Sequence, residues 1–127
     1  MTTTILIVDD DPDSLDIVRT FLESKGYDVY TARDGKSGLA RVEEVEPALV
    51  LLDVMMPGMD GWEVARVIKN HPEHGNTRVV MLTARSGFSD KQEGLRSGAD
   101  DYIVKPIRLD ELATRVEKNL EARAKLS

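Results

Sequence analysis

Several common features are missing from this sequence, and each absence excludes a class of protein. It contains no cysteine, which excludes a disulfide framework and a thiolate metal site. No apolar run approaches the ~20 residues of a membrane-spanning helix, and the first four residues are too short and uncharged to predict a signal peptide. Positive charge is also scarce, since 17 Lys and Arg stand against 23 Asp and Glu. The net charge of -6 disfavours binding to nucleic acid or to an anionic membrane. Since the sequence predicts neither a signal peptide nor a membrane span, we expect a cytoplasmic protein.

The composition is that of an ordinary globular protein. Hydrophobic residues make up 41% of the 127 residues and charged residues 31%. A chain of this length buries roughly two-thirds of the surface that it exposes when unfolded, which is enough for one substantial core. We expect residues 1–127 to form a single domain.

Short apolar runs alternate with longer amphipathic stretches along the whole chain. The runs predict strands at residues 4–8, 29–32, 48–52, 79–82 and 102–104. Apolar positions at helical spacing predict helices at about residues 12–25, 39–45, 64–68, 90–97 and 109–120. Three of the strands are continuously apolar, as in a parallel sheet covered by helices on both faces, whereas the run at 29–32 is more polar and suits a sheet edge. The pattern predicts an α/β fold with an open, doubly wound parallel sheet.

Functional side chains in such a sheet gather at the carboxyl ends of the strands. Asp9 and Asp10 follow the first predicted strand, Asp53 the third, Thr83 the fourth and Lys105 the fifth. If the first and third strands are neighbours, three carboxylates converge, and such a set of oxygen ligands suits a hard divalent cation such as Mg²⁺. Asp53 could attack a phosphoryl group, with the Lys105 ammonium and the Thr83 hydroxyl as donors to phosphate oxygens.

Four segments, ILIVDDD, LLDVMMPGMDG, VMLTA and DYIVKP, stand in an order and spacing that resemble the receiver domain of two-component response regulators. The resemblance covers essentially the whole chain and is to a chemotaxis-regulator-like, single-domain receiver, either a separate regulator or the receiver of a longer protein. It implies a flavodoxin-like (βα)5 sandwich whose five parallel strands have the order 2-1-3-4-5. It also implies that Asp53 is the phospho-acceptor. Asp9, Asp10, Asp53 and the backbone carbonyl of Met55 would then hold Mg²⁺, or Mn²⁺ in its place.

The same resemblance implies a signalling switch rather than an enzyme with a substrate of its own. A sensor histidine kinase or a histidine phosphotransfer protein would phosphorylate Asp53. Thr83 would turn toward the phosphate and Tyr102 would follow it inward, while Lys105, before a commonly cis Pro106, would pair with the phosphate. The face made by the fourth helix, the last strand and the last helix would then act on a downstream protein or output domain. Met55 and Arg85 occupy positions that tune the phosphate lifetime within the family.

Other readings of the aspartate run are less consistent with the sequence. Asp11 precedes Pro12 and is interpreted as a helix cap, and Asp13 as a favourable charge in the first helical turn. An EF-hand loop beginning at Asp9 lacks its glycine and its final glutamate. A haloacid-dehalogenase-type phosphatase would use Asp9 as its nucleophile, but the residues after Asp11 do not continue that motif. A flavodoxin-like electron carrier would need a phosphate-binding loop in place of the aspartates.

Three further features are interpreted as structural. Trp62 is expected to pack in the core, and Met55, Met56 and Met59 to pack within their loop. His71 and His74 lie in a polar connection and are predicted to be solvated, because two histidines alone do not complete a metal coordination shell.

Overall fold

The computed structural model describes residues 2–56, 58–83 and 98–126, and its strands confirm the predicted pattern. The five strands are β1 (Thr4–Val8), β2 (Asp28–Ala32), β3 (Leu49–Asp53), β4 (Arg78–Thr83) and β5 (Asp101–Val104). The helices of the described residues are α1 (Pro12–Ser24), α2 (Gly35–Val45), α3 (Gly61–Asn70) and α5 (Leu109–Leu126). The helix predicted at 90–97 and Arg85 lie outside the described residues.

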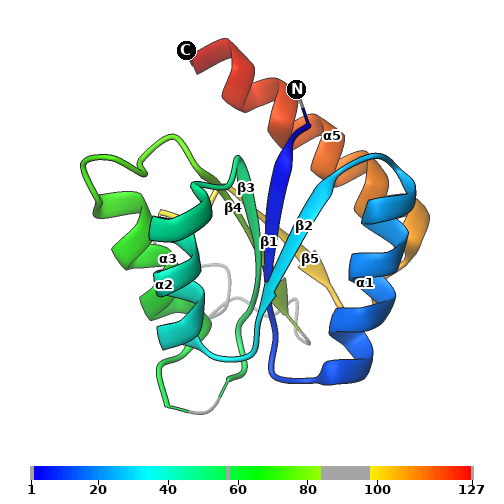
Figure 1. The fold of residues 1–127 in the computed structure, drawn as a ribbon, viewed down its shortest axis with the longest axis horizontal. Helices are drawn as coiled ribbons and strands as arrows, with labels where there is room; N and C mark the ends of the chain where they lie inside the picture. The colour runs from blue at the N-terminus through cyan, green and yellow to red at the C-terminus, as the bar shows by residue number, and fades with distance from the viewer. Residues whose placement is uncertain (1, 57, 84–97, 127) are drawn as a thin grey trace.

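All strand pairs are parallel, and the sheet has the order β2-β1-β3-β4-β5, as the resemblance implied. The more polar β2 is an edge strand, as predicted. Figure 1 shows α1 and α5 on one face of the sheet and α2 and α3 on the other. The fold is therefore a doubly wound α/β sandwich with all five strands ending at the same edge. In the described part of the chain, no helix is long and apolar enough to cross a membrane.

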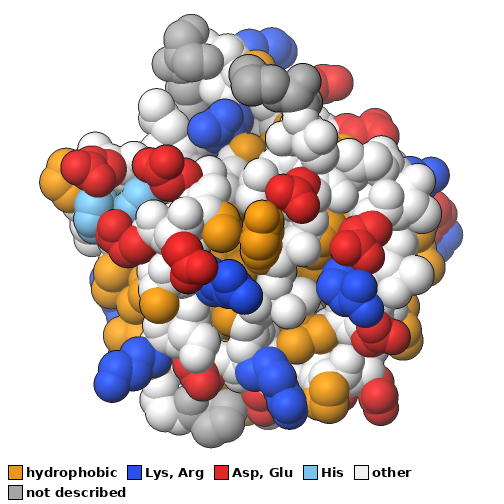
Figure 2. Space-filling model, viewed as in Figure 1, with side chains coloured by type: hydrophobic (Ala, Val, Ile, Leu, Met, Phe, Trp, Pro, Cys, Tyr) orange, Lys and Arg blue, Asp and Glu red, His pale blue; other side chains and the backbone are white. Residues whose placement is uncertain are grey.

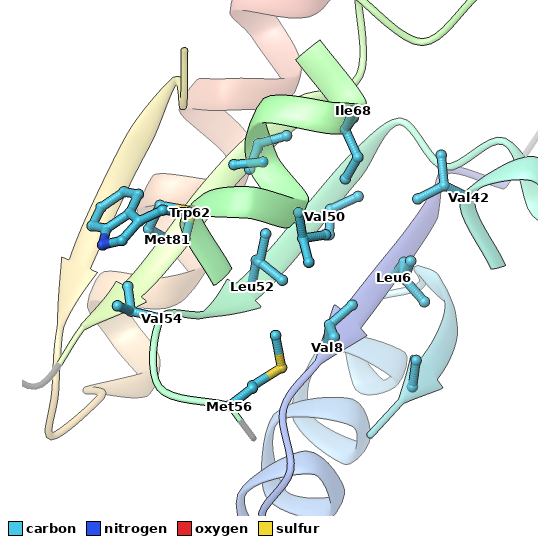
Figure 3. Packing of buried hydrophobic residues seen from close by; sticks show 14 residues of the cluster. Leu6, Val8, Val42, Val50, Leu52, Val54, Met56, Trp62, Ile68 and Met81 are labelled. Carbon is cyan, nitrogen blue, oxygen red and sulfur yellow. The ribbon is translucent and has the colours of Figure 1, made fainter. Parts of the chain in front are cut away.

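Two hydrophobic cores form because successive side chains of a strand point to opposite faces of the sheet. Leu6 and Val8 of β1 face α2 and α3, whereas Ile5 and Ile7 face α1 and α5. The first core is drawn in Figure 3, where Trp62 of α3 packs over the strands and is only 7% exposed. The interpretation of this tryptophan as a packing residue is confirmed.

Side-chain caps define where the helices begin. Asp11 accepts a hydrogen bond from the Asp13 backbone N–H at the start of α1, and Pro12 occupies the first turn. Asp60 caps α3 in the same way, through the Glu63 N–H at 2.9 Å. The capping role predicted for Asp11 and the first-turn position predicted for Asp13 are both confirmed. Neither residue belongs to the acidic cluster described below.

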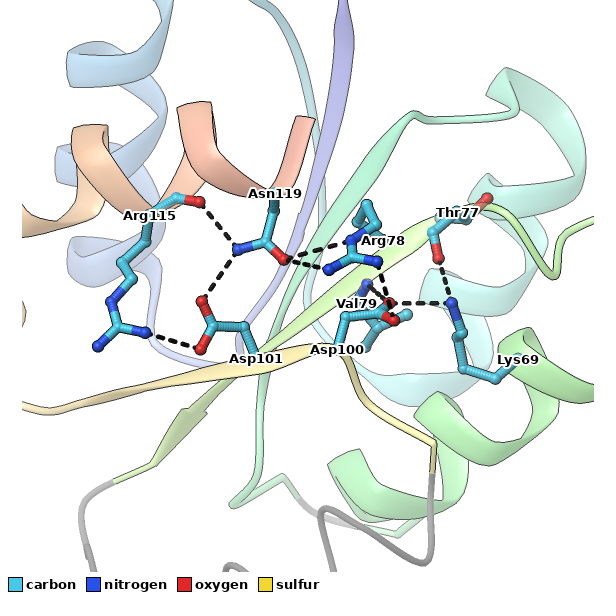
Figure 4. Close-up of polar contacts among 8 residues, drawn as sticks. All are labelled: Lys69, Thr77, Arg78, Val79, Asp100, Asp101, Arg115 and Asn119. Carbon is cyan, nitrogen blue, oxygen red and sulfur yellow. Dashed lines mark hydrogen bonds and ion pairs between the residues drawn. The ribbon is translucent and has the colours of Figure 1, made fainter. Parts of the chain in front are cut away.

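A polar network at the amino ends of β4 and β5 holds α5 against the sheet (Figure 4). The buried Asn119 side chain of α5 accepts a hydrogen bond from Arg78 at 3.1 Å and donates to Asp101 at 3.0 Å. Arg115 adds an ion pair to Asp101 at 2.8 Å, and Asp100 accepts from the backbone of β4 at 2.8 Å. These contacts position β5, the strand that carries Tyr102 and leads to Lys105.

Candidate functional site

Three carboxylates and one ammonium group meet at the carboxyl edge of the sheet. Because Val8 of β1 is in register with Leu52 of β3, the residues that follow, Asp9 and Asp53, lie side by side. The Lys105 Nζ atom, arriving from β5, lies 3.5 Å from Asp53 Oδ1 and 3.6 Å from Asp9 Oδ2. The predicted convergence of these residues is thus present in the fold.

The acidic cluster formed by Asp9, Asp10 and Asp53 has the composition of a magnesium site. Each residue offers one carboxylate oxygen, and these oxygens all lie within 4.8 Å of one another. Asp9 and Asp53 are 2% and 5% exposed, whereas Asp10 is half-buried. Hard divalent cations prefer such oxygen ligands, and Mg²⁺ usually keeps several waters beside one or two carboxylates. The donor set therefore fits Mg²⁺, and the half-buried Asp10 keeps one side of it open to solvent.

The Asp53 carboxyl group is electrostatically the most perturbed member of the cluster. Burial is the main cause that raises its pKa from the ordinary 3.8 to about 6, and the negative charge of Asp9 acts in the same direction. The charge of Lys105 and a hydrogen bond from the Met55 backbone N–H, at 3.2 Å, act in the opposite direction. At neutral pH the group is ionised and nucleophilic, but its charge is costly, so an added cation would stabilise it.

The loop after β3 is shaped by a close backbone approach at Gly61. A Cβ atom at this position would overlap the Asp53 carbonyl oxygen and lie 2.8 Å from the Val54 Cα atom. Gly61 also donates its N–H to the Val54 carbonyl oxygen at 3.1 Å. Only glycine allows the start of α3 to close over the end of β3 in this way. Met55, in the same loop, is 73% exposed, while Met56 packs in the core.

The two predicted switch residues lie in β4 and β5, on the side of β3 away from β1. Thr83 ends β4, is 3% exposed, and accepts the Lys105 backbone N–H through its carbonyl oxygen at 2.7 Å. Tyr102, the second residue of β5, is 36% exposed. The Lys105–Pro106 peptide bond is cis, as the resemblance implied. The backbone thus links the end of β4 directly to the residue that supplies the ammonium group.

Arg33 lies beside the acidic cluster and was not among the residues singled out from the sequence. Its guanidinium group donates to the Asp10 backbone carbonyl at 3.2 Å, and with Lys36 it lines a hollow next to Asp10. The signal was available, because Arg33 follows β2 at the same edge of the sheet.

Two interpretations from the sequence are wrong. Met55 was expected to pack within its loop, but it is 73% exposed. His71 and His74 were both expected to be solvated, but His74 is only 5% exposed. Its ring lies against that of His71, with 4.3 Å between the ring centroids. The end of α3 and the turns that follow it fold back on α2, where both histidines meet Glu43. The local sequence does not show this tertiary contact.

Comparisons with known proteins agree with this geometry. A family model for the response regulator receiver domain matches residues 5–117. A CheY-like response regulator receiver domain protein from Methanospirillum hungatei JF-1 is 32% identical, with a TM-score of 0.92 and full coverage of both chains. The chemotaxis response regulator CheY4 of Vibrio cholerae is 30% identical, with a TM-score of 0.89, over 94% of this chain and 99% of that one.

A third solved structure has the same fold inside a longer protein. NtrX from Brucella abortus is 34% identical, with a TM-score of 0.88, and the match covers 98% of this chain but 28% of that one. One family model matches most of the chain, and the three solved structures are 30%, 32% and 34% identical to it. Together these matches show common family membership as well as a common fold. This chain belongs to the response regulator receiver domain family.

Proposed function

We propose that this domain is a phosphorylation-operated switch in which Asp53 accepts a phosphoryl group. The observation that carries the proposal is the meeting of the Asp53 carboxylate with Asp9, Asp10 and the Lys105 ammonium at one sheet edge. The donor is a phosphohistidine of a sensor histidine kinase or a histidine phosphotransfer protein, and we expect the exchange to take place in the cytoplasm.

An oxygen of the ionised Asp53 attacks phosphorus, an O–P bond forms, and the N–P bond to the donor histidine breaks. The departing imidazole keeps the electron pair and takes a proton from solvent. Asp9, Asp10, Asp53 and the Met55 backbone carbonyl would hold Mg²⁺, or Mn²⁺ in its place, and the bound ion would supply positive charge that offsets the negative charge of both reactants. Lys105, which lies between Asp9 and Asp53, pairs with a phosphoryl oxygen once the group is transferred. Later attack by water releases phosphate.

The output is a population shift at the face that includes β5 and α5. Thr83 is buried at the end of β4, next to the strand that carries Asp53, so its hydroxyl can reach toward a phosphate there. Tyr102 is 36% exposed, so an inward movement would bury further surface. Phosphate shifts the equilibrium only by its differential affinity for the two states. The predicted fourth helix, the remaining part of this face, lies outside the described residues.

The partners follow from this chemistry. One is the phosphohistidine donor, and the other is a downstream protein or an output domain that reads the face of β5 and α5. The match to part of the longer NtrX chain supports a linked output domain, and the match to a Methanospirillum hungatei chain over its full length supports a separate target. No direct contact with nucleic acid or membrane is expected, given the net charge of -6.

Incubation with acetyl phosphate and Mg²⁺, followed by intact-mass measurement, tests the proposal. The wild type should gain one phosphoryl group, and Asp53→Asn should gain none. Asp13→Asn is the matched control, because Asp13 is an exposed aspartate in the first turn of α1 and should leave phosphorylation intact. A wild type that stays unmodified would refute the proposed acceptor role. Turnover of a generic phosphate ester that survives Asp53→Asn but not Asp9→Asn would instead favour the phosphatase reading.

A further inference from the structure

A second group of metal-ligating side chains lies away from Asp53, where α2 meets the turns after α3. It consists of Glu43, His71 and His74, called here the His–Glu cluster. Glu43 comes from the last part of α2, and the two histidines stand at the end of α3 and in the connection to β4. The sequence alone offered only two neighbouring histidines; the fold adds the third ligand from another helix.

The three donor atoms lie within 4.8 Å of one another, and two of the three distances match the spacing of ligands around one metal ion. Glu43 Oε1 lies 3.2 Å from His71 Nε2 and 3.3 Å from His74 Nε2. For metal–ligand bonds of 2.0–2.1 Å, the edge of a coordination tetrahedron is about 3.3 Å. A small inward or outward shift of exposed side chains is enough to seat an ion, since Glu43 is 59% exposed.

We propose that the His–Glu cluster binds a divalent transition metal of the zinc class, through His71 Nε2, His74 Nε2 and a Glu43 carboxylate oxygen. Two imidazoles and one carboxylate are a ligand set that Zn²⁺ accepts, with water in the fourth position. Imidazole also suits Cu²⁺ and Ni²⁺, whereas Mg²⁺ prefers oxygen ligands alone. The exposed Glu43 side leaves the fourth position open to water.

The hydrogen bonding of the metal-free cluster shows what binding must change. The His71 Nδ1 atom accepts the Glu73 backbone N–H at 3.1 Å, which places the proton of a neutral His71 ring on Nε2, facing Glu43. Metal binding at Nε2 moves this proton to Nδ1, so the Glu73 N–H has to turn away. One exposed hydrogen bond is exchanged for a coordinate bond. The His74 Nε2 atom faces the same Glu43 oxygen, which can only accept, so it also carries a proton that metal binding must move to Nδ1. Burial holds the His74 ring in place during this exchange.

The His–Glu cluster and the acidic cluster lie at opposite edges of the sheet. α2 begins after β2, at the edge where Asp9 and Asp53 lie, and runs back toward the other edge, where Glu43 is found (Figure 1). Figure 2 shows the histidines at the surface with acidic side chains around them, which favours a cation. Metal at this position would tie α2 to the α3–β4 connection without touching the proposed phosphorylation site.

Thermal unfolding at increasing Zn²⁺ concentrations tests the inference. Mg²⁺ is kept in excess so that the acidic cluster does not take up Zn²⁺. We expect Zn²⁺ to raise the melting temperature of the wild type. Glu43→Gln and His71→Gln change partly exposed side chains and should fold. Each variant should need at least ten times more Zn²⁺ than the wild type for the same rise in melting temperature. Glu44→Gln, the neighbouring exposed glutamate of α2, is the matched control and should respond like the wild type.

Co²⁺ absorption in the visible range gives a second measurement that does not depend on stability. A tetrahedral cobalt site with imidazole ligands should give strong bands in the wild type and Glu44→Gln, and these bands should be lost in Glu43→Gln. The inference is overturned if Zn²⁺ does not raise the melting temperature of the wild type. It is equally overturned if Glu43→Gln and His71→Gln respond as the wild type does. None of these measurements involves phosphorylation of Asp53, so the two proposals can fail separately.

Discussion

Replacing Asp53 by asparagine should stabilise the magnesium-free domain at neutral pH. The folded protein raises the pKa of this carboxyl to about 6, mainly by burial, from an ordinary value of 3.8. A raised pKa means that the folded state holds the proton more tightly than the unfolded state does. The associated stability is fully present below about pH 4 and is lost as the pH rises through 6. A shift of about two units corresponds to roughly 2–3 kcal/mol.

The side chain of Asp53 is only 8% exposed, so solvent screening takes away little of this effect. An asparagine side chain cannot ionise, and the Asp53→Asn variant should therefore gain stability relative to the wild type between about pH 4 and pH 7.5, by up to about 3 kcal/mol. Urea unfolding followed by circular dichroism, in EDTA and at several pH values, measures this difference, provided that the denaturant slope stays the same. Addition of Mg²⁺ should stabilise the wild type more and close the gap.

The control is Asp13→Asn, which removes a charge from the first turn of α1. This variant should lose about 0.3–1 kcal/mol at neutral pH through the helix dipole, a change of opposite sign. If Asp53→Asn is no more stable than the wild type at pH 7.5 in EDTA, the reasoning from burial is wrong. A gain that does not change with pH would refute it as well, because it would not come from ionisation.

Three other predictions concern the residues around the site. Mg²⁺ at one hundred times its dissociation constant should add about 2.7 kcal/mol of stability, and thermal melts should show that Asp10→Asn loses most of this gain and Asp13→Asn keeps it. Gly61→Ala should cost more than about 3 kcal/mol in urea unfolding, since its Cβ atom would overlap the last carbonyl oxygen of β3. Gly58→Ala, at a φ of +81° with open space around it, should cost only about 1–2 kcal/mol. Asn119→Ala should lower the free energy of unfolding by about 1–3 kcal/mol, because Arg78 and Asp101 would lose a buried hydrogen-bonding partner. Equal urea midpoints for the variant and the wild type would contradict this.

Much of the fold could be predicted because the signals are local. Continuous apolar runs, helical spacing and caps such as Asp11-Pro12 are properties of neighbouring residues, and the strand ends agree with prediction to within one residue. The position of the site followed from a general rule, that parallel strands present their functional residues at their carboxyl ends. The order of the strands came only with the family resemblance, since nothing local specifies which strands pair.

Contacts between distant elements could not be predicted in this way. Asn119 links β4, β5 and α5 through side-chain positions that depend on how whole elements pack. His74 was expected in solvent and is buried, because the connection after α3 folds onto α2.

The sequence by itself determined the α/β pattern, the helix starts and the residues that stand at the carboxyl edge of the sheet. These depend on periodicity, on capping chemistry and on motifs of adjacent residues. Only the tertiary structure decided how strongly those residues act on one another. The pKa of Asp53 is raised because packing removes it from water, and Glu43 joins two histidines because two helices meet. Burial and long-range contact arise from the packed fold, so local sequence could not supply them.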